Sequence, residues 1–281
     1  MIPRLQKLDE LPSIKDLLVQ NGLWAKKSLG QNFLLNSDIT DRIASKAMVK
    51  EKTVLEIGPG PGGLTRSLLK AGAHHVFAIE KDIRCLSLLQ SLTEASNNHL
   101  KVFEKDALKL KIGSFIEEQG ITSPLHIVSN LPYHIGTQLL FNWFKELNLI
   151  GSMTLMFQKE VSERIVAKPG RDAYGRLSLI SQYLCDATIL FHLPPSVFTP
   201  APKVTSSVIR LIPKVLSEEE RKVIPSLEKI TRLAFGQRRK MLKSSLKSLL
   251  SEDRIASLGI PPTSRPEELP LEIFVRLARF I

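Results

Sequence analysis

The sequence predicts a two-part fold, an α/β domain built on a mostly parallel sheet followed by a small all-α domain at the C-terminus. Short apolar strand patterns alternate with helical patterns up to about Pro213, which is typical of a parallel sheet with helices on both faces. Beyond Pro213 only helical patterns remain. The chain has 281 residues, 43% of them hydrophobic, and this fits one large domain with a sizeable core and one smaller domain.

The elements of the predicted α/β domain follow one another in a regular order. A short helix is expected around residues 13–21, and a longer helical pattern begins after Asn36, a residue type that caps helices well. Thr53–Ile57 is an apolar strand that leads directly into a glycine-rich turn and then into a helix ending near Lys70. Further strands are predicted at His75–Glu80, Leu100–Lys105, His126–Asn130, Met153–Phe157 and Thr188–Leu193.

The predicted C-terminal domain consists of helices alone. These helices are expected at Ser217–Phe235, Arg239–Leu250 and Glu267–Phe280. The sequence is therefore divided into an N-terminal lead over residues 1–23, an α/β domain over residues 24–213 and a helical domain over residues 214–281.

The charge balance points to a polyanionic partner. Lysine and arginine exceed the acidic residues by 11, which favours nucleic acid, with an anionic membrane surface as the alternative. The two cysteines, Cys85 and Cys185, lie far apart and outside any metal-binding spacing, so neither a zinc centre nor a disulfide framework is expected. There is no apolar run of about 18 residues for a membrane span, and no signal-peptide pattern. We expect a cytoplasmic monomer without a metal.

The glycine-rich turn after the first strand predicts a nucleotide-like ligand. Three of its glycines fit the GxGxxG pattern, namely Gly58, Gly60 and Gly63. Glu80 ends the next strand, at the position where an acid accepts hydrogen bonds from ribose hydroxyls in dinucleotide-binding folds. Pro59 and Pro61 each remove a backbone N–H that a pyrophosphate would use. The loop therefore favours a ligand without pyrophosphate, such as S-adenosylmethionine (SAM), over a dinucleotide or over a turn that binds nothing.

A second acid follows the third predicted strand. Asp106 lies where a carboxylate could accept a hydrogen bond from an adenine amino group. The alternative is a solvated loop carboxylate or a helix cap, a position that aspartate occupies readily. Because it comes in series with Glu80, we favour the ligand-binding role.

The fourth main strand delivers a tetrapeptide, Asn130-Leu131-Pro132-Tyr133, to its carboxyl end, where open α/β sheets bind ligands. This tetrapeptide resembles the (D/N)PPY signature of methyltransferases that act on the amino group of adenine or cytosine. The Asn130 amide oxygen and the Leu131 carbonyl could accept the two N–H bonds of such an amine. The Tyr133 ring could stack on the base, an interaction worth roughly 1–3 kcal/mol. A simple strand-ending turn is the alternative.

Three further segments resemble one family, the bacterial small-subunit (16S) ribosomal RNA adenine N6,N6-dimethyltransferases. Residues 26–34 (KKSLGQNFL) are similar to the K(K/R)xxGQNFL signature of that family. Residues 198–208 (FTPAPKVTSSV) resemble its FxPxPxVxS(A/S)V segment, and residues 235–242 (FGQRRKML) its FxxRRK(T/M)L run. The matching segments span roughly residues 24–280 in the expected order.

The resemblance implies a Rossmann-like class I SAM-dependent methyltransferase domain and assigns roles to individual residues. The implied SAM contacts are Asn32, Leu34, Gly58, Glu80, Asp106 and Asn130. Phe198 would stack on the target base opposite Tyr133, although a buried aromatic beside a proline turn is the alternative. The implied substrate is a pair of adjacent adenosines in a hairpin loop near the 3′ end of small-subunit rRNA, and the implied role is in 30S subunit biogenesis.

A basic run in the helical domain suggests phosphate binding. Residues 229–247 contain seven lysines and arginines and no acid, whereas ordinary charged surfaces mix both signs. The expected RNA-phosphate contacts are Arg238, Arg239, Lys240 and Lys243. A looser basic stretch over residues 164–176 is interrupted by Asp172 and is compatible with plain surface.

Three alternative functions stay open on the sequence alone. A large-subunit rRNA adenine methyltransferase of the antibiotic-resistance type shares the chemistry. An NAD-dependent oxidoreductase shares the glycine loop but leaves the tetrapeptide at residues 130–133 unexplained. A non-catalytic RNA-binding assembly factor could use the same scaffold.

Overall fold

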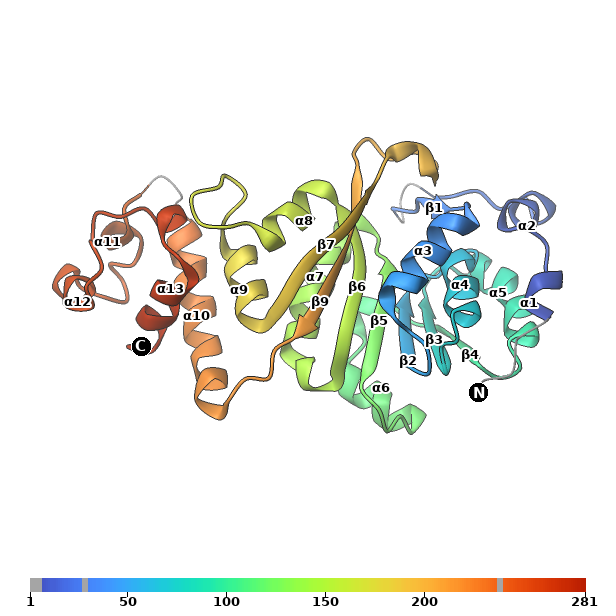
Figure 1. The fold of residues 1–281 in the computed structure, drawn as a ribbon, viewed down its shortest axis with the longest axis horizontal. Helices are drawn as coiled ribbons and strands as arrows, with labels where there is room; N and C mark the ends of the chain where they lie inside the picture. The colour runs from blue at the N-terminus through green and yellow to red at the C-terminus, as the bar shows by residue number, and fades with distance from the viewer. Residues whose placement is uncertain (1–6, 27–29, 237–239) are drawn as a thin grey trace. The chain divides into compact units, whose positions relative to one another are not determined.

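The computed structural model describes residues 7–26, 30–236 and 240–281, and it divides into two compact units (Figure 1). The first unit comprises Met1–Lys159 and Ile189–Pro213, and the second comprises Glu160–Thr188 and Lys214–Ile281. Among the described residues, no helix is long and apolar enough to cross a membrane.

The described chain contains one seven-stranded sheet with the strand order β4-β3-β2-β5-β6-β9-β7. Its parallel strands are β2 (Thr53–Ile57), β3 (His75–Glu80), β4 (Leu100–Glu104), β5 (Leu125–Asn130) and β6 (Ile150–Gln158). The strand β9 (Ser206–Pro213) runs antiparallel to β6, and β7 (Cys185–Leu193) lies beyond β9. The mostly parallel α/β fold predicted from the sequence is therefore confirmed, with β9 as a strand that the pattern analysis did not identify.

Helices cover both faces of the parallel strands because side chains alternate along each strand. On one face, Val76 and Ala78 of β3 join a buried cluster with Leu64 and Leu68 of α4 (Gly63–Lys70). On the other, Phe77 meets Phe115 of α6 (Ile112–Gln119) edge to face, with ring centroids 5.6 Å apart. The first cluster also receives α3 (Ser37–Ala47) and α5 (Ile83–Ala95). This double coverage is what a buried parallel sheet requires.

The predicted helix starts are largely confirmed by their caps. The Asn36 side chain accepts a hydrogen bond from the Asp38 N–H at 2.8 Å and opens α3. Ser13 does the same for α2 (Ile14–Gln20), within the range expected around residues 13–21. The lead also contains a one-turn helix, α1 (Lys7–Glu10). Ile14 and Leu18 are buried against Cys85 of α5, so the lead belongs to the first unit.

The second unit combines C-terminal helices with two helices from the middle of the chain. Its elements are α8 (Lys159–Val166), α9 (Arg176–Leu184), α10 (Glu218–Gly236), α11 (Leu242–Ser245), α12 (Glu252–Ser257), η5 (Pro266–Glu268) and α13 (Leu271–Ala278). The Tyr174 hydroxyl donates to the Leu269 carbonyl at 3.0 Å, and its ring meets Phe235 at 6.1 Å. The second unit is thus larger than the helical domain predicted over residues 214–281. It also contains residues 160–188, which pack with the C-terminal helices.

Two of the predicted C-terminal helices are shorter in the structure. The last begins after Pro270, since proline lacks the N–H that a helix interior needs. Of the helix expected at Arg239–Leu250, the described part contains only α11, and α12 was not predicted.

Candidate ligand-binding and catalytic site

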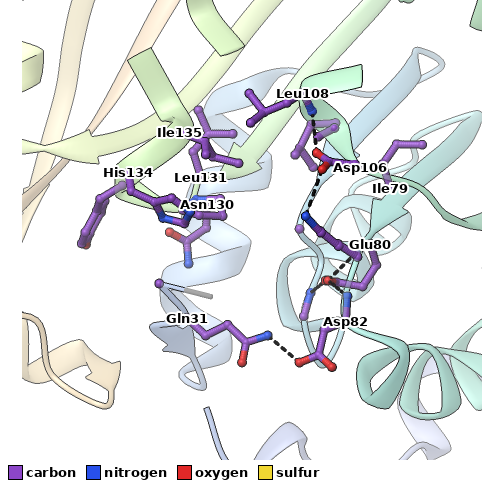
Figure 2. A pocket seen from close by; sticks show the side chains of 18 of the residues that line it. Gln31, Ile79, Glu80, Asp82, Asp106, Leu108, Asn130, Leu131, His134 and Ile135 are labelled. Atoms are coloured by element: carbon purple, nitrogen blue, oxygen red, sulfur yellow. Dashed lines mark hydrogen bonds and ion pairs between the residues drawn. The ribbon is translucent and has the colours of Figure 1, made fainter. Parts of the chain in front are cut away.

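A cavity of about 360 Å³ lies at the carboxyl ends of β2, β3, β4 and β5, where open α/β sheets bind ligands (Figure 2). Its lining comes from residues 30–33, from positions within 57–60, and from residues 79–82, 105–108 and 130–135. In Figure 2 the acids Glu80 and Asp106 lie on one side of the cavity. The start of the tetrapeptide, Asn130 and Leu131, lies on the other. The cavity therefore joins the two motifs that the sequence placed on separate strands.

The glycine turn after β2 is held to the end of β3 by its own backbone. Gly58 and Gly60 have φ values of 66° and 55°, in the left-handed region that favours glycine. The Gly58 N–H donates to the Ile79 carbonyl at 2.9 Å, and the Gly60 N–H donates to Glu80 Oε2 at 3.0 Å. A Cβ at Gly60 would come within 3.0 Å of the Phe33 ring, so this glycine also allows a close approach.

The Glu80 carboxylate is fixed at the cavity wall by backbone donors. Besides the bond from Gly60, its Oε1 accepts from the N–H groups of Lys81 at 2.8 Å and Asp82 at 2.7 Å. The residue is 6% exposed, and this burial raises its pKa although the three hydrogen bonds act in the opposite direction. Glu80 is thus a preoriented acceptor at the position predicted for a ribose contact.

Asp106 combines the two roles that the sequence left open. It lines the cavity, and its Oδ1 also accepts from the Leu108 N–H at 3.0 Å to cap the short helix η2 (Ala107–Lys109). Its Oδ2 accepts from Lys81 Nζ at 2.9 Å, and this contact lowers the pKa of the carboxyl. Asp106 is therefore an ionised acceptor beside the cavity.

Asn130 ends β5 with its amide orientation set by a backbone contact. Its Nδ2 donates to the Asn32 carbonyl at 3.0 Å, so its Oδ1 is the amide atom left to accept a hydrogen bond from a ligand. Pro132 follows as the N-cap of α7 (Tyr133–Trp143). The strand end and the helix start thus present the whole tetrapeptide to the cavity, as its lining shows.

Tyr133 is held by Ser206, a serine for which the sequence alone predicted no role. Its hydroxyl and Ser206 Oγ are 2.6 Å apart, and Ser206 is fully buried at the start of β9. Burial raises the pKa of Tyr133, which keeps the phenol protonated. The sequence signal that could have indicated this role is the pair of serines, Ser206 and Ser207, inside the FTPAPKVTSSV segment.

Glu56 is a second residue without an assigned role in the sequence analysis. It lies on β2, is 1% exposed, and accepts a hydrogen bond from Thr65 Oγ1 of α4 at 2.6 Å. Burial raises its pKa from 4.5 to about 8. Glu56 thus connects the strand before the glycine turn with the helix after it.

Leu34 and Phe198 do not line the cavity at which the other predicted SAM-contact and base-stacking residues lie. The two form a register pair between the short strands β1 (Phe33–Leu34) and β8 (Phe198–Thr199). Leu34 is 6% exposed and Phe198 is 3% exposed, both within a hydrophobic core cluster. Neither is among the described residues that line the cavity. Their roles in contacting SAM and the target base stay predictions.

The expected phosphate contacts belong to the second unit. Arg238 and Arg239 lie outside the described residues. Lys240 is exposed, and Lys243 Nζ forms ion pairs with both carboxylate oxygens of Glu252 at 3.0 and 3.2 Å. A phosphate at Lys243 would therefore compete with Glu252 for the ammonium group.

The donors of the glycine turn fit SAM better than a dinucleotide. Gly58, Gly60 and Gly62 already use their N–H groups, the last for the Pro59 carbonyl at 3.0 Å. Pro59 and Pro61 have none, so the turn offers little to the oxygens of a pyrophosphate. Two carboxylates, Glu80 and Asp106, are suited instead to hydroxyl and amino groups.

Comparison with known proteins gives a consistent result. The ribosomal RNA adenine dimethylase family matches residues 22–281. Ribosomal RNA small subunit methyltransferase A of Caulobacter vibrioides is 52% identical over 256 residues, covering 91% of this chain and 96% of that protein. Its namesake from Mesorhizobium japonicum is 47% identical over 281 residues, covering 98% and 99%.

Two solved structures extend the comparison to the fold. A dimethyladenosine transferase from Plasmodium falciparum is 28% identical, with a TM-score of 0.71 over 86% of this chain and 94% of that one. The 23S rRNA methyltransferase ErmE is 25% identical, with a TM-score of 0.68 over 88% and 98%. Together with the match from residue 22 to residue 281, these likenesses show that the chain belongs to the ribosomal RNA adenine dimethylase family.

Proposed function

We propose that this protein uses SAM to dimethylate the N6 amino groups of two adjacent adenosines in a hairpin loop near the 3′ end of small-subunit rRNA. The observation that carries the proposal is the tetrapeptide at residues 130–133, which lines the cavity and whose first two residues lie across it from Glu80 and Asp106. The curated relatives that are 46–52% identical over nearly the full chain are named for the small subunit. Modification at this site would make the protein a contributor to 30S subunit biogenesis.

Three of the chain's own residues, at the carboxyl ends of β2, β3 and β4, would hold the cofactor. Glu80 would accept hydrogen bonds from ribose hydroxyls, and Asp106 from the adenine amino group. Gly58 would allow the ligand to approach the backbone closely. When bound, SAM supplies an electrophilic methyl group on a sulfonium centre.

The tetrapeptide would orient the target amine. An exocyclic amine is a weak nucleophile because its lone pair is delocalised into the ring. Acceptance of its two N–H bonds by Asn130 Oδ1 and by the Leu131 carbonyl would favour the pyramidal form. Tyr133 would support the base with its ring while Ser206 holds its hydroxyl. Most of the acceleration would then come from alignment, which can contribute several powers of ten in rate.

The test is transfer of labelled methyl groups from SAM to unmethylated small subunits, large subunits and their naked RNAs, followed by mapping of the modified nucleosides. We expect dimethyladenosine in small-subunit rRNA alone. Asn130→Ala and Tyr133→Ala should lower the rate about 100-fold or more, because each loses part of the alignment. Asn148→Ala, an exposed asparagine in the same unit, is the matched control and should transfer methyl normally.

Other outcomes would identify the alternatives. Label in large-subunit RNA would instead assign the protein to the antibiotic-resistance type of large-subunit methyltransferase. The likeness to the 23S rRNA methyltransferase ErmE is the observation that favours this alternative. SAM binding without transfer to any of these RNAs would favour a non-catalytic assembly factor.

A further inference from the structure

The corner after β3 is tied to the N-terminal segment by a buried carboxylate, that of Asp82. Its Oδ2 accepts a hydrogen bond from Gln31 Nε2 at 2.9 Å, a contact that Figure 2 shows. Arg84 donates to the same carboxylate through Nε at 3.0 Å and Nη2 at 2.5 Å. The Asp82 side chain is 4% exposed, and the hydrogen bonds from Arg84 lower its pKa to about 2. Asp82 is thus an ionised acceptor in a fixed position beside the cavity.

Gln31 uses both ends of its amide. While Nε2 donates to Asp82, Oε1 accepts from the Lys26 N–H at 2.8 Å, so a rotation of the amide would lose both bonds. Arg84 Nη1 adds a second tie, to the Trp24 carbonyl at 3.2 Å. The backbone at Gln31 is therefore held by the corner between β3 and α5.

Asn32, the residue after Gln31, contacts the tetrapeptide directly. The Asn32 carbonyl accepts from Asn130 Nδ2 at 3.0 Å, and the following residue, Phe33, is fixed by its pairing with Thr199. The Asn130 amide could turn either its oxygen or its NH2 group toward a ligand, and the contact with Asn32 selects the oxygen. Only the oxygen can accept an N–H bond from an amine.

We propose that Asp82 and Gln31 are positioning residues for methyl transfer, which fix the Asn32 carbonyl and through it hold Asn130 with Oδ1 toward the target amine. This inference rests on the proposed function, because the amine is the group that Asn130 would face. Asp82 thus has two contacts at the site. Its side chain orients Gln31, and its backbone N–H donates to Glu80 at 2.7 Å.

Gln31→Glu is the sharpest test, because it keeps the shape of the side chain. The new carboxylate cannot donate to Asp82 and places a second negative charge within hydrogen-bonding distance of it. We expect kcat at saturating SAM and RNA to fall about tenfold or more, as misalignment does. The Kd for SAM, measured by calorimetric titration, should rise by a smaller factor than kcat falls, because Glu80 and Asp106 are untouched although Gln31, Asn32 and Asn130 also line the cavity.

Gln90→Glu is the matched control. Gln90 is exposed on α5 and donates to Glu94 at 3.1 Å, so the substitution makes the same chemical change beside another carboxylate in the same unit. Its kcat and its SAM affinity should equal those of the unsubstituted protein.

A compensating substitution separates positioning from general damage. In Gln31→Glu combined with Asp82→Asn, position 82 gains a donor and position 31 an acceptor, so the contact can re-form with its polarity reversed. Arg84 Nη2, which shares Asp82 Oδ2 with Gln31, then donates to the new carboxylate at position 31 instead, and the charge of the cluster stays balanced. We expect this double variant to recover part of the kcat that Gln31→Glu loses. A double variant no faster than the single one would overturn the pairwise role.

A measurement without catalysis completes the test. In ¹⁵N-labelled protein the side-chain NH2 signals of Asn130 are identified by their loss in Asn130→Ala. We expect slow hydrogen exchange at this NH2 group in the unsubstituted protein and in Gln90→Glu, and faster exchange in Gln31→Glu. Unchanged exchange in Gln31→Glu, or a loss of SAM affinity with kcat intact, would overturn the inference. If the unsubstituted protein transferred no methyl group, the proposed function would fail, while the exchange result would still decide the positioning role.

Discussion

At the residue scale, Glu56 is a carboxyl group kept out of water on β2. Thr65 donates to it, and the nearby charge of Glu80 adds to the effect of burial on its pKa. The folded protein therefore holds a proton on Glu56 at pH values where the unfolded chain has released it. The residue stabilises the glycine turn best when it is neutral.

This arrangement predicts a pH dependence of stability. Because the pKa rises from 4.5 in the unfolded chain to about 8 in the folded one, the free energy of unfolding should fall as the pH rises through that window. The slope from this group is up to about 1.4 kcal/mol per pH unit. Glu56→Gln, which cannot ionise, should flatten it in urea unfolding between pH 5 and 8.

The control for this prediction is Glu104→Gln, at an exposed carboxyl that ends strand β4 of the same sheet. It should leave the pH dependence unchanged. Equal slopes in the unsubstituted protein and in Glu56→Gln would contradict the buried, protonated state.

Several site residues could be predicted from the sequence because their local patterns carry their function. Glu80 follows a glycine loop at a known spacing, and Asn130 begins a tetrapeptide whose Asn and Tyr side chains each have a chemical reason. Ser206 and Gln31 could not be assigned roles in this way. Their partners are 73 and 51 positions away, and such contacts become visible only when the strands are placed.

At the scale of elements, the glycine turn between β2 and α4 is constrained by backbone conformation and by space at once. Gly60→Ala should cost about 1–2 kcal/mol for its left-handed φ. Its Cβ should also displace Phe33, a cavity-lining ring, and weaken SAM binding about tenfold or more. Thermal unfolding and calorimetric titration measure the two effects separately.

Gly120→Ala is the matched control for the turn. Gly120 has a similar φ of 63° but nothing within 4 Å of the added Cβ. It should lose a comparable amount of stability and bind SAM normally. Equal SAM affinity in Gly60→Ala would show that the ring adjusts without effect on the ligand.

Strands with a simple alternating or continuous apolar pattern were predicted well, and β9 shows where such patterns fail. Its sequence, SSVIRLIP, begins with two buried serines, so the polar residues that normally mark a boundary lie inside the sheet. The helix predicted from Glu267 fails for a different reason, because Pro270 sets the start of α13.

At the scale of the whole molecule, the positive charge of the second unit is unevenly spread along α10 and the residues after it. The first turn of α10 is acidic, with Glu218, Glu219 and Glu220, whereas residues 229–247 contain no acid. A phosphate-binding face is therefore expected at the second of these segments.

Lys240→Glu tests this expectation within the described residues. We expect weaker binding to small subunits and a decrease of about one in the slope of log affinity against log salt concentration. Lys222→Glu, in the acid-rich part of α10 where Lys222 pairs with Glu219, makes the same charge change and should alter neither quantity. Equal salt slopes for both variants would contradict a phosphate contact at Lys240.

The division into units was the hardest feature to predict. Tyr174 and its partner Leu269 are 95 positions apart, and no periodicity within residues 160–188 reveals that they pack with the C-terminal helices. Charge and helix content identified the second unit, but only the buried contacts define its full extent.

The residues of the site and its supports lie at different positions along the chain, so they are translated in a fixed order. Among the described residues, those that line the cavity lie between Gly30 and Ile135, so this lining has been translated by the time the ribosome reaches Ile135. Ser206, which holds Tyr133, and β8, which pairs with β1, are translated much later. The residues that line the pocket for SAM are thus translated before the residues that support Tyr133 and β1.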